Sequence, residues 1–245
     1  MKLAGVFLAA LGTALATGLG ALPFLFSRAA GRRWLGLANA GAAGFMLAAS
    51  VALAIEGAQR GPWRLVAGAI AGAAFIVVAQ RLLHDRDDLR LGALRGADAR
   101  KAVTIVAVMT IHSLTEGIGV GVSYGGGRTL GVFITIAIAI HNIPEGLAIS
   151  LVLVPRGASV RAAAWWSVFS SLPQPLLAVP AYLFVEKFKP FLPVGLGFAA
   201  GAMIWLVLSE LIPDARGSAS NRAVGGVLAV TFAAMMGLQE LLLRF

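Results

Sequence analysis

Eight apolar runs divide the chain, each close to the ~20 residues that an α-helix needs to cross the ~30 Å hydrocarbon core of a membrane. Backbone polar groups in lipid must be paired within their own segment, so runs of this kind have to be helices. With 59% hydrophobic and only 13% charged residues, the chain has the balance of a membrane protein. We expect an all-α polytopic membrane protein with one transmembrane domain over residues 1–245. The expected helices are approximately 3–27, 35–57, 63–83, 102–123, 130–153, 163–185, 193–213 and 222–243.

The distribution of basic residues predicts an orientation in the membrane. Most of the 20 arginines and lysines lie around 28–34, 81–101, 154–162 and 214–222, which share one side if the helices alternate in direction. Because cytoplasmic loops are enriched in arginine and lysine, we expect both termini outside and a cytoplasmic loop at 84–101. The net charge of +9 is then explained without a nucleic-acid partner. The expected location is the cell membrane, inner or plasma, with the lipid bilayer as a partner.

A weak internal repeat supports the count of eight helices. At one constant offset, Pro23 matches Pro180, the run 42–46 matches 199–203, and Gly68 matches Gly225. The repeat pairs helices 1–3 with helices 6–8, and an offset of five helices requires the second copy to be inverted. This predicts a 3+2+3 arrangement with the fourth and fifth helices between the copies, which is typical of many transporters. The repeat also argues against reading the first run as a cleaved signal peptide.

The fourth and fifth expected helices each carry a histidine followed four residues later by a glutamate. The pairs are His112 with Glu116 and His141 with Glu145, in the sequences HSLTEG and HNIPEG. Residues four apart share one helix face, so two adjacent helices could present all four side chains to one point. Both motifs fall at the expected membrane midplane, where each acid costs about 2.5–3.5 kcal/mol. A structural ion pair would offset this cost, but two identical motifs favour a functional polar site.

Two imidazoles and two carboxylates form a ligand set for a divalent transition metal. The chain has no cysteine, so nitrogen and oxygen atoms must hold any metal. This donor set suits zinc, and also iron, manganese, cobalt or cadmium, whereas calcium and magnesium prefer all-oxygen sites. Prolines in the fifth and sixth helices predict irregular backbone beside the site. They are Pro144, Pro173, Pro175 and Pro180.

These features together resemble the ZIP (Zrt- and Irt-like protein) family of divalent-metal transporters, bacterial type, over essentially the whole chain. The resemblance implies movement of zinc or a similar cation into the cytoplasm by alternating access, with the metal as substrate and no cofactor. It implies a first metal position held by His112, Glu116, His141 and Glu145. A second position would be lined by Ser113, Asn142 and Gln174. Family members commonly carry a glutamate where this chain has Gln174, so we expect the second position to be weak.

Acids near helix ends are weaker candidates for a cation pathway, because such residues often lie simply at the headgroup level. They are Glu56 and Glu240 at the expected outer ends, and Glu210 and Asp214 at an inner end. The many small residues suit close helix packing and would also suit a homodimer. The main alternative function is an intramembrane metal-dependent hydrolase that activates water with the same residues. No His-Glu-x-x-His motif occurs and no further base is evident, so we expect no enzyme.

Overall fold

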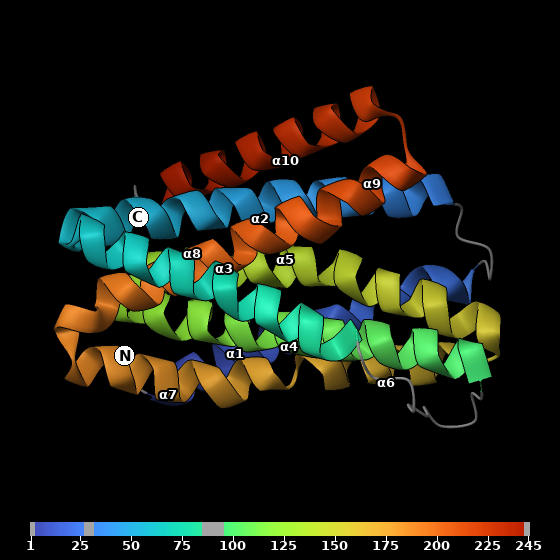
Figure 1. The fold of residues 1–245 in the computed structure, drawn as a ribbon, viewed down its shortest axis with the longest axis horizontal. Coiled ribbons are helices and arrows are strands. Elements are labelled where there is room, and N and C mark those ends of the chain that lie inside the picture. Colours follow the sequence, from blue (N-terminus) through green and yellow to red (C-terminus); the bar gives the residue numbers. More distant parts are fainter. Residues whose placement is uncertain (1–2, 27–31, 85–95, 243–245) are drawn as a thin grey trace.

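The computed structural model describes residues 3–26, 32–84 and 96–242, and within these ranges every regular element is a helix. Eight passes run back and forth along the long axis of one bundle, and α1 begins at the end where α10 finishes (Figure 1). The first five are α1 (Leu3–Gly18) with η1 (Leu19–Leu25), α2 (Arg32–Arg60), α3 (Pro62–His84), α4 (Gly96–Gly126) and α5 (Arg128–Leu153), which ends in the short η2 (Val154–Arg156). The last three are α6 (Val160–Ser171) with α7 (Pro173–Lys187), then η3 (Lys189–Phe191), α8 (Leu192–Leu206), η4 (Val207–Leu211) and α9 (Ile212–Ser218), and finally α10 (Asn221–Leu242).

Seven of these passes are long and apolar enough to cross a membrane, as judged on the described residues. The remaining pass, α4, is 31 residues long and carries the first histidine–glutamate motif in its middle. The expectation of an all-helical polytopic membrane protein is therefore confirmed. The inverted relation between the two halves and the side on which the termini lie stay predictions.

Three passes are irregular near a proline. Proline has no N–H to donate to the carbonyl four residues earlier, so it interrupts the regular helix. The first pass tightens into a 3₁₀ helix around Pro23. The sixth pass breaks at Leu172, and α7 restarts at Pro173. The seventh pass contains the π-helical turn η4, with Pro213 just beyond it. The prolines of the sixth pass predicted its break, whereas the irregular turns of the first and seventh passes were not predicted. In the fifth pass, where irregular backbone was expected, α5 continues through Pro144 without a break.

The first turns of α4 lie where the sequence predicted a loop. The expected cytoplasmic loop covered 84–101, whereas α4 already begins at Gly96 and α3 continues to His84. Residues 85–95 lie outside the described part of the chain. Any connecting segment between α3 and α4 is therefore shorter than expected.

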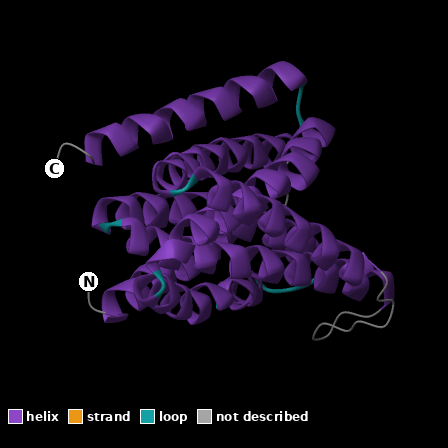
Figure 2. Ribbon diagram, turned by 60° about the vertical axis from the view of Figure 1, so that its left-hand side comes forward, coloured by secondary structure: helices purple, strands orange, loops and turns teal. Residues whose placement is uncertain are grey.

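Small residues determine how closely the helices approach one another. A Cβ added to Gly121 of α4 would lie 2.2 Å from the carbonyl oxygen of Ala178 in α7. The same test at Gly197 of α8 gives 2.1 Å to the carbonyl oxygen of Leu65 in α3. Backbones at this separation are typical of membrane helices that pack through small residues. Along the edge of the bundle, α10 lies against α2 (Figures 1 and 2).

The two motif-bearing helices lie in the middle of the bundle. α4 packs against α5, α7 and α8, and α5 also packs against α1 and α2. The side chains around them are buried in one large apolar cluster that includes Met46, Phe133, Ile138 and Met203. This placement encloses the polar motif residues on all sides.

Candidate metal centre

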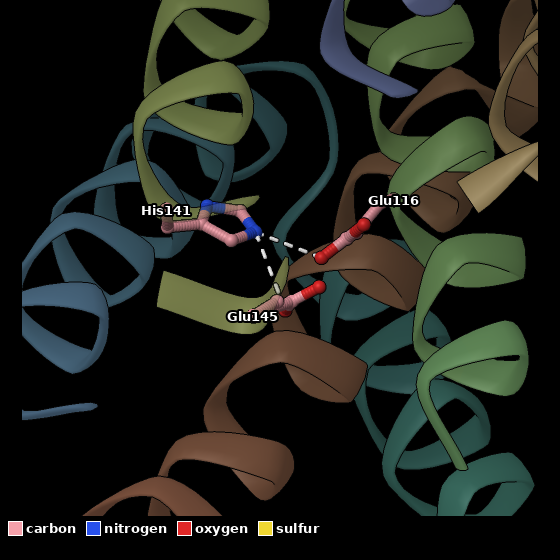
Figure 3. Close-up of side chains that lie close together, drawn as sticks. All are labelled: Glu116, His141 and Glu145. Atoms are coloured by element: carbon pink, nitrogen blue, oxygen red, sulfur yellow. Dashed lines mark hydrogen bonds and ion pairs between the residues drawn. The ribbon is translucent and has the colours of Figure 1, made fainter. Parts of the chain in front are cut away.

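Glu116, His141 and Glu145 form a compact buried group where α4 and α5 face each other. One ligand atom from each lies within 4.8 Å of the others, and their exposed fractions are 0%, 0% and 3%. Nε2 of His141 is 2.7 Å from Oε1 of Glu116 and 3.9 Å from Oε1 of Glu145. The imidazole ring points between the two carboxyl groups (Figure 3). One nitrogen and two carboxylate oxygens thus converge in an arrangement able to hold a cation.

The backbone of α5 fixes the orientation of His141. Nδ1 of His141 is 3.1 Å from the carbonyl oxygen of Ala137, one turn earlier in the same helix. A carbonyl oxygen only accepts, so Nδ1 carries a hydrogen, and whenever the ring is neutral its lone pair is on Nε2, the atom that faces the carboxylates. This arrangement of a ring N–H bonded to a carbonyl is typical of histidines that bind metal.

A polar network extends from Glu116 away from the histidine. Nε2 of the fully buried Gln174 donates to Oε2 of Glu116 at 2.6 Å and lies 3.5 Å from Oγ of Ser113. Oε1 of Gln174 accepts from Oγ1 of Thr13 at 2.5 Å and from Nδ2 of Asn142 at 3.3 Å. The structure therefore brings together the three residues expected at a second position, on the opposite side of Glu116 from His141.

His112 lies apart from this three-residue group. Its Nε2 is 3.3 Å from Oε2 of Glu210, in the π-helical turn η4. The contact has ion-pair distance but not hydrogen-bond geometry. Of the four ligands expected at the first position, the structure gathers Glu116, His141 and Glu145 and places the fourth against the seventh pass.

Unsatisfied polar atoms are concentrated at this centre. Among the described residues, five buried side-chain nitrogen or oxygen atoms have no hydrogen-bond partner. Three of them belong to expected site residues, namely Nε2 of His112, Oδ1 of Asn142 and Oε2 of Glu145. Buried polar atoms are nearly always paired, so such a cluster indicates a site that binds something.

Irregular backbone and glycines bring these side chains together. The break at Leu172 places Gln174 in the first turn of α7, against α4 at Gly117. A Cβ at Gly146 would lie 1.7 Å from the carbonyl oxygen of Thr17, so α1 crosses α5 directly beside Glu145. Pro144 leaves the carbonyl oxygen of Ile140 without its usual donor within α5.

The four candidate pathway acids have different surroundings. Glu56 is ion-paired with Arg60 at 2.5 Å beside a pocket of ≈ 420 Å³ lined by polar and apolar residues, and the same arginine donates to the carbonyl oxygen of Gly126. Asp214 and Glu240 are exposed. Only Glu210 contacts a motif residue among the contacts described, so it is the acid most closely connected to the centre.

Two buried threonines of the first pass join the network without having been predicted. The hydroxyl of Thr13 donates to Gln174, and the carbonyl oxygen of Thr13 accepts from Nδ2 of Asn142 at 2.9 Å. Oγ1 of Thr17 is 2.8 Å from Oγ of Ser171. Both threonines are almost fully buried. Their spacing of four residues in an otherwise apolar run was the available signal, since it places both hydroxyls on one helix face.

A helical membrane bundle that encloses a Glu-His-Glu group in its centre defines a polytopic membrane protein with an intramembrane site able to hold a cation. A family model described as ZIP Zinc transporter matches residues 78–237. The zinc transporter GufA of Myxococcus xanthus is 33% identical over 227 residues, covering 87% of this chain and 89% of its own length. The chain belongs to the ZIP zinc transporter family.

Two further relatives are longer than this chain. A putative zinc transporter of Arabidopsis thaliana is 47% identical over 244 residues, covering 98% of this chain but only 39% of its own length. The zinc transporter ZIP11 of Homo sapiens is 35% identical over 156 residues, covering 58% of this chain and 44% of its own length. The resemblance read from the motifs is thus confirmed, and the family is one of transporters and not of hydrolases.

Proposed function

We propose that this protein carries divalent transition-metal cations, zinc foremost, across the membrane through the Glu116, His141 and Glu145 centre. The observation that carries the proposal is the burial of two carboxylates and an imidazole with their ligand atoms within 4.8 Å of one another. Two acids at the membrane midplane cost several kcal/mol, at about 2.5–3.5 kcal/mol each. A divalent cation bound between them offsets this cost because it neutralises both charges.

The donor atoms support zinc or a similar metal. The chain offers nitrogen and oxygen and no thiolate. One imidazole and two carboxylates suit zinc, and iron, manganese, cobalt and cadmium remain alternative substrates. His112 would complete four ligands after leaving Glu210, since it lies one helical turn before Glu116. The relatives named as zinc transporters favour zinc among these metals.

The proposed direction is into the cytoplasm, by alternating access. The resemblance to the family supports the inward direction, and the enclosed position of the centre between helices supports alternating access. The basic segments predict which end of the bundle faces the cytoplasm. Helices α4 and α5 would keep the ligands while the surrounding passes open first to one side and then to the other. The protein would act in the cell membrane.

Flux into proteoliposomes tests the proposal directly. The purified chain is reconstituted with a zinc-sensitive dye trapped inside, and zinc is added outside. We expect uptake by the unaltered protein and a loss of at least about tenfold in Glu145→Gln, which keeps the shape but removes a ligand charge. The matched control is Glu186→Gln, the same chemical change at an exposed residue paired with Lys189. Equal flux in both variants would reject the centre as the transport site.

A further inference from the structure

Glu116 has two carboxylate oxygens with different partners. Oε1 is 2.7 Å from Nε2 of His141, whereas Oε2 accepts from Nε2 of Gln174 at 2.6 Å. Glu116 has an exposed fraction of 0%. One edge of this carboxylate therefore faces the imidazole and Glu145, and the other edge is occupied by an amide N–H.

The surrounding bonds fix which way the Gln174 amide points. Its Oε1 accepts hydrogen bonds from Thr13 and Asn142, so the carbonyl end is matched with donors. Turning the amide by 180° would set its oxygen 2.6 Å from the Glu116 carboxylate oxygen and its NH₂ against the Asn142 NH₂. Both contacts would be repulsive, so the nitrogen must face Glu116.

An amide nitrogen cannot act as a metal ligand, which changes the expected role of Gln174. For a cation to bind beside Oε2 of Glu116, the amide would have to leave, and one N–H of Asn142 would lose its buried acceptor, while the Thr13 hydroxyl would keep the carbonyl oxygen of Ala10. Losing a partner in this way costs about 1–3 kcal/mol per buried group. Gln174 thus blocks the second position that the sequence predicted it to line.

The charge of the centre leads to the same conclusion. Glu116 and Glu145 supply two negative charges, while His141 as a ligand and Gln174 are neutral. One divalent cation brings the sum to zero. A second would add two positive charges, of which Glu210 beside His112 could offset only one, among side chains that are almost fully buried, where uncompensated charge is most costly.

Resting on the proposed transport function, we infer that the centre takes one cation at a time and that Gln174 is the positioning residue responsible. Its amide holds Glu116 so that Oε1 faces the metal, and it occupies Oε2 so that this oxygen cannot bind a second metal. The metal is a single divalent cation bound by Glu116, His141 and Glu145, with His112 as the fourth ligand once it leaves Glu210, and Gln174 contacts a ligand but not the metal.

Counting bound metal tests the inference. Each purified protein is dialysed to equilibrium against cadmium or zinc, and metal per chain is measured by mass spectrometry. Weak binding elsewhere is removed by subtracting the value for the same protein carrying Glu145→Gln. We expect one metal per chain for the unaltered protein and two for Gln174→Glu, which would place a carboxylate against Oε2 of Glu116 and so require a second cation. A count of one for Gln174→Glu would overturn the role of Gln174 in excluding it.

The count for the unaltered protein separates the two proposals. Two metals per chain would overturn the one-cation inference but would still support a metal centre. If no metal binds, the proposed function itself is rejected. Gln174→Met then tests positioning, because it preserves volume but cannot donate to Glu116. We expect one metal bound about 10–100-fold more weakly, as for other residues that orient ligands.

A purely structural role for Gln174 would lower the melting temperature of Gln174→Met and leave the bound metal unchanged. The visible absorption of bound cobalt distinguishes the two roles, since it reports the ligand geometry. We expect a shifted cobalt spectrum in Gln174→Met and an unshifted one in Glu186→Gln. An unchanged affinity and spectrum in Gln174→Met would overturn the positioning role, and if that variant does not fold, the metal counts of the other proteins still decide.

Discussion

At the scale of single residues, His141 links the backbone of α5 to the proposed chemistry. Its Nδ1 is tied to the carbonyl oxygen of Ala137, so Nε2 is the atom that can exchange a proton for a metal. The 2.7 Å contact between Nε2 and Glu116 requires a hydrogen between the two atoms. A cation bound there takes the place of that hydrogen, and metal binding is therefore coupled to release of a proton.

This exchange predicts a dependence of metal binding on pH. Histidine titrates between pH 5 and 8, and the protonated ring cannot coordinate. As the pH falls through this interval, protons compete more strongly with the metal, so affinity and uptake should both decrease. The measurement is zinc uptake into proteoliposomes held at equal pH inside and outside, at several values from 8 to 5. Uptake that stays flat across the interval would argue against His141 as a ligand.

Glu210 gives a second prediction at this scale. It lies 3.3 Å from His112 and its side chain is 25% exposed, so it connects the neighbourhood of the centre with the end of the seventh pass. We expect Glu210→Gln to lower flux without weakening equilibrium metal affinity, because Glu210 is not one of the three gathered residues and holds His112 away from them. Flux and affinity are measured on the same preparation, with Glu186→Gln as the control. An affinity loss as large as that of Glu145→Gln would make Glu210 a ligand instead.

At the scale of elements, the contact between α4 and α7 determines the geometry of the centre. Gly117 follows Glu116 directly and faces the backbone of Gln174. The two helices therefore cross at the point where the side chain of Gln174 donates its hydrogen bond to Glu116. Gly121, one turn later, faces Ala178 in the same way. The distance between the two helices thus sets the distance between ligand and positioning residue.

Adding one methyl group at this crossing should disturb the centre. The Cβ of Gly117→Ala would lie 2.6 Å from the carbonyl oxygen and 2.7 Å from the Cα of Gln174, so the helices must separate. We expect a loss of about 1–3 kcal/mol from overpacking, together with weaker metal binding. The control is Gly12→Ala in α1, whose Cβ would meet nothing within 4 Å and should be neutral or slightly stabilising. Melting temperature and metal affinity are measured for both, and equal values would contradict the role of this crossing.

The sequence predicted the helical elements and the grouping of Glu116, His141 and Glu145 because both depend on local patterns. Apolar runs of sufficient length and a spacing of four residues on α4 and α5 were enough. The contribution of Thr13 was not predicted, since it depends on α1 crossing α5, which no local pattern specifies. The position of His112 beside Glu210 was missed for the same reason. The direction of the Gln174 amide was beyond the sequence as well, because it is decided by partners on three other helices.

At the scale of the whole molecule, the distribution of charge predicts which end of the bundle faces the cytoplasm. The turn between α4 and α5 and the turn between α9 and α10 lie at opposite ends of the bundle (Figure 1). The second of these ends carries Arg216 and Arg222 within a basic segment, which predicts that it is cytoplasmic. Transport toward the cytoplasm then means movement from the α4–α5 turn toward the α9–α10 turn.

The absence of cysteine from the sequence makes this orientation directly measurable by single-cysteine labelling. Thr129→Cys lies in the exposed first turn of α5, and Gly217→Cys replaces an exposed residue of α9 whose Cβ would meet nothing within 4 Å. With a maleimide that does not cross membranes, we expect intact cells to label Thr129→Cys and not Gly217→Cys, and permeabilised cells to label both. The opposite pattern would place both termini in the cytoplasm. Transport into the cytoplasm would then run from the α9–α10 turn toward the α4–α5 turn, so labelling and flux together determine the direction along the bundle.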